Sequence, residues 1–242
     1  LEKELLTESK LNQLKINFPK RNVLRYLWRS PGDYLIVQSI NRKGYFSHLS
    51  AAYLHELVPN KPKQVYFNVE QSFKTNYYGE PVVTQINLDK AFNKKPRRSS
   101  QVAKLGNQKV IQLGGKHSDY IDIITIDYKS QLIRTSSLER TLIECTTRPF
   151  YSGGSRNILE MFRRAKESID LEKMLSLLED FEFIYPYHQS LGFYLSRAGF
   201  KMSDLVKFKS MGFEFKFYLD YELLKPKLDS EWNIVYPSSL DE

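Results

Sequence analysis

Hydrophobic and polar positions follow a helical period near the start of this chain. Apolar residues in 3–14 and 20–29 recur three and four positions apart, and 34–40 is a short apolar run bounded by turn residues. These patterns predict two short helices and a strand. Helix, helix and strand in this order indicate a short, winged-helix-like segment over residues 1–40, which precedes a mixed α/β domain over 41–242.

Strand-like patterns dominate the middle of the chain, and helical patterns dominate its second half. Ser47 can cap a largely apolar helix, and Ser136 stands three residues before Glu139, as in a capping box. Gly106-Asn107 suits a hairpin turn. The expected strands are 64–69, 101–105, 109–113, 120–127 and 131–135, then 212–221 and 232–237; the expected helices are 136–149, 152–168, 170–181 and 186–198. The fold class predicted is α+β.

The stretch "YPYHQSLGFYLSRAGF" (185–200) is unusually aromatic for a helix. Tyr187, Leu191 and Tyr194 share one face, which is typical of core packing. Gly192 inside a helix costs about 1 kcal/mol relative to alanine, and it often indicates that another group approaches the backbone closely. The polar residues on the remaining faces predict a partner surface: His188, Gln189 and Arg197.

Charge is distributed unevenly along the chain. The net charge is +8, but residues 1–118 hold 20 Lys and Arg against 8 Asp and Glu, whereas 119–242 hold the other 16 against 20. A first half at +12 is typical of a protein that faces a polyanion. The alternative is general basicity that serves solubility.

Several classes of protein are disfavoured by composition. No apolar run approaches the roughly 18–20 residues that span a bilayer, and no secretion signal is visible, so we expect a cytoplasmic protein. A single cysteine, Cys145, rules out an internal disulfide. The four histidines show no metal-ligand spacing, so we expect no metal and no cofactor. The sequence begins at Leu1, which leaves open that an N-terminal piece is missing.

One pattern indicates enzymatic chemistry. In "SDYIDIITIDYK" (118–129), Asp122, Asp127 and Lys129 lie along an expected strand, as the metal-binding acids and lysine of a restriction-type nuclease would. Asp-x-Lys also arises often by chance. A metal-dependent nuclease is therefore an alternative hypothesis.

Two basic clusters are candidates for nucleic-acid binding. Pro96 and the serines at 99–100 favour an exposed loop, where cations can reach phosphates. The alternative is an ordinary solvated loop. The candidate residues are Lys90, Lys94, Lys95, Arg97 and Arg98, together with Lys20, Arg21, Arg25 and Arg29 in the segment 20–29.

Five phrases in order resemble a known family. They are "GYFSHLSAAYLHEL", "VYFNVEQS", "SSLERTLIECTTRPFYSGG", "YPYHQSLGFYLSRAGF" and "FEFKFYL", spread over about 35–237. Together they resemble the abortive-infection AbiEi family, the antitoxin half of type IV toxin–antitoxin systems. The most family-like parts are "SH-x-SAA" and "LERTLI". The matching positions include Ser47, Ala51, Glu139, Arg140 and Thr141. Most of these are expected to be structural: Glu139 caps its own helix, and Arg140 pairs with an acidic or carbonyl partner.

The resemblance implies a non-enzymatic transcriptional regulator of a phage-defence system. Members bind double-stranded DNA at their own promoter through an N-terminal winged helix, and their C-terminal domain acts as the antitoxin. That domain is in some relatives a degenerate restriction-endonuclease-like fold, and the cognate toxin, a separate chain, resembles a nucleotidyltransferase. Here the winged helix is absent or shortened to residues 1–40. A protein-interaction module without DNA binding is a further alternative.

Overall fold

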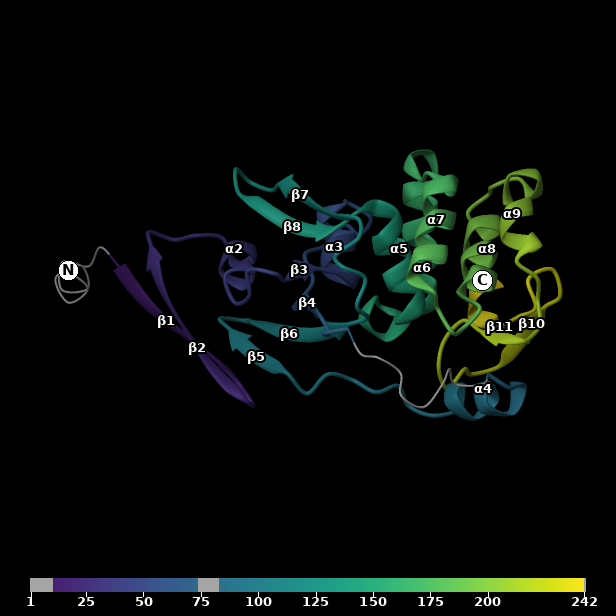
Figure 1. Cartoon of the computed structure of the whole chain (residues 1–242), viewed down its shortest axis with the longest axis horizontal. Coiled ribbons are helices and arrows are strands. Elements are labelled where there is room, and N and C mark those ends of the chain that lie inside the picture. The colour runs from purple at the N-terminus through teal and green to yellow at the C-terminus, as the bar shows by residue number, and fades with distance from the viewer. Residues whose placement is uncertain (1–10, 74–82, 242) are drawn as a thin grey trace.

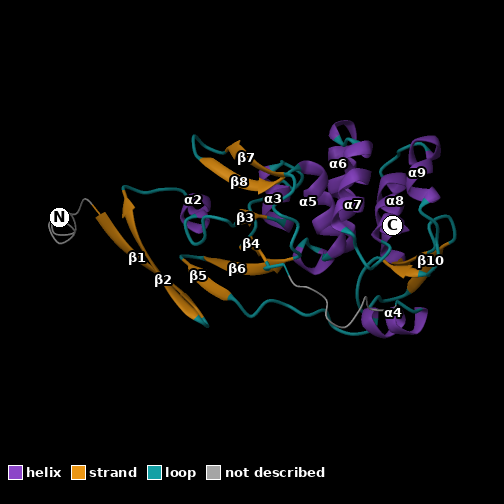
Figure 2. Ribbon diagram, viewed as in Figure 1, coloured by secondary structure: helices purple, strands orange, loops and turns teal. Residues whose placement is uncertain are grey.

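The computed structural model describes residues 11–73 and 83–241. A two-stranded arm lies at one end, a six-stranded sheet in the middle, and a group of helices with a small second sheet at the other end (Figures 1 and 2). The chain thus has the α+β fold that its sequence predicts.

The central sheet is mixed, with the strand order β5-β6-β4-β3-β8-β7. β4 runs parallel to β6, β3 pairs with β8 in parallel, and the remaining neighbours are antiparallel. The predicted strands in this region are confirmed, including the hairpin through Gly106-Asn107. The strands are β3 (Tyr45–Phe46), β4 (Gln64–Glu70), β5 (Val102–Leu105), β6 (Gln108–Gly115), β7 (Ile123–Asp127) and β8 (Leu132–Ser136).

The arm corrects the first sequence prediction. Residues 20–29 were expected to form a helix, but β1 (Leu11–Phe18) and β2 (Arg21–Trp28) form an antiparallel hairpin. Ile16, Phe18 and Val23 alternate toward the core and are buried. The same stretch also has apolar residues three and four positions apart, so its pattern fits both periods. The predicted helix 3–14 is wrong from residue 11 onward, and its first eight residues lie outside the described part.

The predicted strand 34–40 is also wrong, because α2 (Asp33–Gln38) occupies it. A short apolar run fits a buried strand and a buried helix equally well. Tyr34, Ile36 and Val37 join one hydrophobic core with the arm and with sheet residues such as Phe67. The order helix, helix, strand, from which the winged-helix-like segment was predicted, is therefore absent from residues 11–40.

The second half is helical, as predicted. Its helices enclose a large core that includes Phe162, Tyr194 and Trp232. Ser47 stands at the N-cap position of α3, as expected, but its side chain makes no capping hydrogen bond and lies 2.9 Å from His48 Nδ1. The cap of α5 is Ser137 rather than Ser136, since the Ser137 side chain accepts from the Arg140 backbone N–H. α3 (His48–Leu54) lies in the first half of the chain. The helices of the second half are α5 (Leu138–Thr147), α6 (Gly154–Ala165), α7 (Leu171–Phe181), α8 (Tyr187–Arg197) and the short α9 (Val206–Ser210).

A further helix, α4 (Gln85–Phe92), was not predicted. The Thr84 side chain caps it, and Leu88 and Phe92 bury its inner face. It lies beside the small C-terminal sheet of β9 (Phe217–Tyr218), β10 (Pro226–Asp229) and β11 (Ile234–Pro237), in the order β10-β11-β9 (Figure 1). Within the described ranges no helix is long and apolar enough to cross a membrane.

Candidate functional site

The basic loop that follows α4 is exposed, as predicted. The side chains of Lys94, Lys95, Arg97 and Arg98 are all exposed, and no acidic residue stands between 93 and 101. Among the described residues, none of these four cations forms an ion pair with a carboxylate. Their charges are therefore available to an anion in solvent.

The tip of the arm lies next to this loop, although 70 or more residues separate the two in sequence. Arg21 Nη2 donates to Gln112 Oε1 at 2.7 Å, and Ser99 Oγ donates to the main-chain carbonyl of the same Gln112 at 2.6 Å. Lys20 occupies the turn of the hairpin and is exposed. In Figure 1 the tip and the loop run along one edge of the molecule. We call Lys20, Arg21, Lys94, Lys95, Arg97 and Arg98 the basic edge.

The three other residues that were predicted to contact DNA are not part of the basic edge. Arg25 is half-buried and donates from Nε and Nη2 to the carbonyl of Ser39, at 3.1 and 2.5 Å, so it fastens the arm to the end of α2. Arg29 follows β2, at the opposite end of the arm from the tip. Lys90 is exposed in the last turn of α4 and so precedes the basic loop.

The alternative nuclease residues are not brought together. Asp122 precedes β7 and forms an ion pair with Lys173 at 3.0 Å, whereas Asp127 ends β7 and accepts from the Ser130 backbone N–H in the following turn. The two residues are five positions apart, which along a strand separates their Cα atoms by about 16 Å. Lys129 lies over the Tyr128 ring in that same turn. Over residues 11–73 and 83–241, no three His, Cys, Asp or Glu side chains gather as metal ligands would.

The predicted partner surface is wrong for two of its three residues, because His188 and Gln189 are buried in α8. His188 Nε2 lies 2.7 Å from the carbonyl of Gly212, and Gln189 Nε2 donates to the carbonyl of Trp232 at 2.9 Å. Both side chains join α8 to the C-terminal segment. Arg197 is less buried, but it pairs with Asp241 at 2.9 Å.

Buried histidines should make the protein sensitive to mild acid. Burial lowers the pKa of His55 and of His188 below the ordinary value of about 6.5 that an unfolded chain has. The unfolded state then binds more protons as the pH falls through that value, so this contribution to stability is present above it and is lost below it. We expect the melting temperature to fall between about pH 7.5 and about pH 5.5, and less so in His55→Gln and in His188→Gln.

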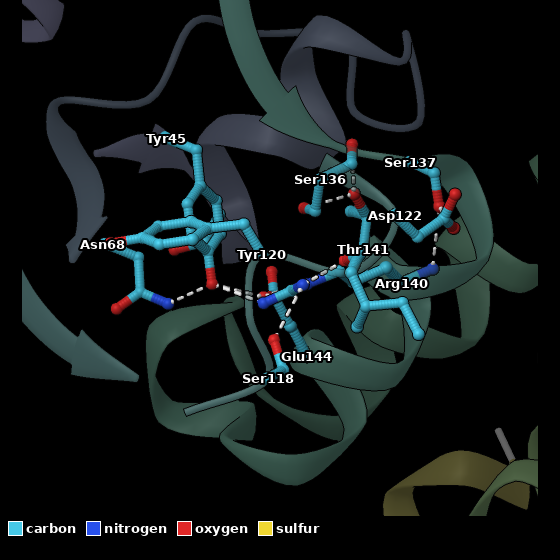
Figure 3. Close-up of polar contacts among 12 residues, drawn as sticks. Tyr45, Asn68, Ser118, Tyr120, Asp122, Ser136, Ser137, Arg140, Thr141 and Glu144 are labelled. Carbon is cyan, nitrogen blue, oxygen red and sulfur yellow. Dashed lines mark hydrogen bonds and ion pairs between the residues drawn. The ribbon is translucent and has the colours of Figure 1, made fainter. Parts of the chain in front are cut away.

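The most extensive buried polar network surrounds Arg140 on α5 (Figure 3). Its guanidinium donates to Glu70 Oε1 at 3.0 Å, to Glu144 Oε1 at 3.1 Å and to the Tyr45 hydroxyl at 2.5 Å. It also donates to Ser118 Oγ and to the carbonyl of Ile121. Only 2% of the Arg140 side chain is exposed. The arginine thus joins β3, β4, α5 and the segment before β7.

The two acids of this network differ in electrostatic environment. Burial is the largest influence on Glu144 and raises the pKa of its carboxyl, although Arg140 acts in the opposite sense. Burial also acts on Glu70, but hydrogen bonds from Ser118, Arg140 and the Tyr120 backbone outweigh it and lower the pKa of that carboxyl. Glu70 is therefore the firmly charged partner of Arg140.

Sequence reasoning found only part of this network. It expected Arg140 to pair with an acidic or carbonyl partner, and this is confirmed. It expected Glu139 to cap its own helix, but the Glu139 carboxylate accepts from the Asp170 backbone N–H and pairs with Lys173. Glu70 and Tyr45 were missed, because their partners lie about 70 and 95 residues away along the chain.

Comparison with known proteins shows similarity of fold to a solved structure. No family model matches the chain, and no curated protein matches it. Among solved structures, the RV2827C protein from Mycobacterium tuberculosis is similar over 97% of this chain and 78% of its own, with a TM-score of 0.62 and 12% sequence identity. At this identity the likeness concerns the fold alone.

Proposed function

We propose that this protein is a non-enzymatic, DNA-binding regulator, and that the basic edge contacts the phosphates of double-stranded DNA. The observation that carries the proposal is the joining of two sequence-distant basic segments through Gln112. Cations gathered from two segments on one edge can contact several phosphates of one duplex, and each such contact adds affinity.

The cellular role that we propose rests on the resemblance to the AbiEi family. It is an antitoxin and transcriptional regulator of a phage-defence type IV toxin–antitoxin system, acting in the cytoplasm with a nucleotidyltransferase-like toxin as its partner. The separation of Asp122 from Asp127 and Lys129 removes the support for the nuclease alternative.

Removing the cations of the loop should weaken DNA binding and flatten its salt dependence. In a variant with Lys94, Lys95, Arg97 and Arg98 all changed to Ala, the log–log salt slope should fall by up to about three to four, at roughly 0.9 for each lost phosphate contact. Changing Lys20 and Arg21 to Ala should lower the slope by a further one to two, at the same rough value per contact. The loss should be similar for two unrelated duplexes, because phosphate contacts carry no sequence information.

The matched control removes four exposed cations from another part of the molecule, namely Arg163, Arg164, Lys201 and Lys207. It should keep most of the wild-type slope. Equal losses in the two variants would mean that net charge alone governs binding, and that the basic edge is no specific interface. Melting curves of both variants verify that they are folded, since exposed charges contribute little to stability.

A further inference from the structure

A pocket of about 540 Å³ lies between the Arg140 network and the helical half of the protein. One side consists of Tyr45 from β3, His48 from α3 and Asn68 from β4. The opposite side is the segment 181–187, and α5 contributes Arg140, Glu144 and Arg148. This volume is within the range of about 300–1,000 Å³ that is typical of small-molecule sites.

Three residues that line this pocket have buried polar atoms that lack a hydrogen-bond partner among the described residues. They are His48 Nε2, Asn68 Oδ1 and Glu144 Oε2. Their residues are only 2%, 3% and 9% exposed. A buried polar group without a partner costs about 1–3 kcal/mol. Three such atoms in one pocket indicate a ligand that hydrogen-bonds to them, and Asn68 Oδ1 and an ionised Glu144 both require N–H or O–H donors.

Two cationic side chains besides Arg140 also line the pocket, Arg148 and Lys116. Arg148 is half-buried, Lys116 is exposed, and within the described ranges neither side chain pairs with a carboxylate. Lys116 Nζ instead donates to the main-chain carbonyls of Phe181 and Glu182. Burial lowers the pKa of His48, and the charges of Arg148 and Arg140 lower it further. Arg140, by contrast, is already balanced by Glu70 and Glu144.

Aromatic rings also line the pocket, and two of them have a cation over the ring: Arg140 lies 5.1 Å from the centre of Phe181, and Lys116 lies 5.8 Å from the centre of Phe183. Phe181 and Phe183 are 5.2 Å apart, and Phe183 meets Tyr187 edge-on at 5.1 Å. Such rings favour a flat ring system, which can stack on them or pack against their edges.

From these features we propose that the pocket binds a nucleoside monophosphate. Its base lies against these aromatic rings and donates N–H groups to Asn68 and Glu144, and its phosphate lies between Arg148 and Lys116. The lining supplies acceptors from Asn68 and Glu144, ring contacts from residues 181–187, and the two cations Arg148 and Lys116. A base with an exocyclic amino group and a single phosphate matches all three.

The experiment is calorimetric titration of the full chain with the 5′-monophosphates of adenosine, guanosine, cytidine and uridine. At least one amino-bearing nucleotide should bind saturably and raise the melting temperature. Arg148→Gln and Lys116→Gln should each weaken that nucleotide about tenfold, since a charge-assisted hydrogen bond is lost. The same variants should leave the affinity for the free nucleoside nearly unchanged. Arg163→Gln, at an exposed position on α6, is the control that should change neither affinity.

Three results would overturn the proposal. One is the absence of saturable binding by any of the four nucleotides at millimolar concentration. Another is equal affinity for ribose 5-phosphate or inorganic phosphate, which would show that the base contributes nothing. The third is unchanged nucleotide affinity in both pocket variants, which would place the ligand elsewhere. The quadruple loop variant distinguishes this site from the basic edge, because it should lose DNA affinity and keep nucleotide affinity.

Discussion

Arg140→Met is expected to destabilise the protein by about 3–5 kcal/mol, because it leaves the carboxylates of Glu70 and Glu144 buried without their cation. The hydroxyl of Tyr45 loses a donor in the same substitution, although Asn68 still donates to it at 2.6 Å. For a chain of this size the melting temperature should fall by roughly 6–20 °C. Chemical denaturation and a thermal melt measure the two quantities independently.

The matched control is Arg163→Met. Arg163 also pairs with a glutamate, at 2.6 Å, but 49% of its side chain is exposed. An exposed pair contributes about 1 kcal/mol or less. If Arg140→Met costs no more than this control, the network does not hold β3, β4 and α5 together as we describe. A triple variant that adds Glu70→Gln and Glu144→Gln should recover part of the loss, since it removes both unpaired charges.

The pattern of hydrophobic residues was sufficient to predict those helices and strands whose period is unambiguous. The helix at 170–181 is long and regular, and it is confirmed. The arm was not predictable in this way, because Leu14, Ile16 and Phe18 alternate as a strand while Leu24, Leu27 and Trp28 also fit a helix. In the folded protein the alternating face lies on the core, and tertiary packing decides between the two periods.

Sites were harder to predict than elements for a physical reason. An exposed loop can be predicted from local composition, so the cations at 94–98 were found. A buried polar network depends on which distant strands meet, and neither Glu70 nor Tyr45 carries a local signal for Arg140. The same limit explains the error over His188 and Gln189, whose polar side chains bond to main-chain carbonyls inside the core.

One residue, the glycine inside the predicted helix 186–198, did predict a contact with a distant part of the chain. Gly192 lies in α8, and a Cβ atom placed there would be 2.0 Å from the Trp232 ring. Trp232 is fully buried and its Nε1 donates to Ser196 Oγ at 3.2 Å, so the ring has little room to move. Gly→Ala within a helix normally stabilises by about 1 kcal/mol, whereas overpacking a core costs about 1–3 kcal/mol or more. An overlap with a rigid, enclosed ring belongs at the upper end of that range, so Gly192→Ala should destabilise the protein by about 2 kcal/mol net and lower the melting temperature by roughly 4–8 °C. A double-mutant cycle with Trp232→Leu identifies the cause, because the alanine should cost much less once the ring is gone. A stabilising Gly192→Ala, or a cost that is the same with and without the indole, would show that the glycine has some other purpose than close approach of Trp232.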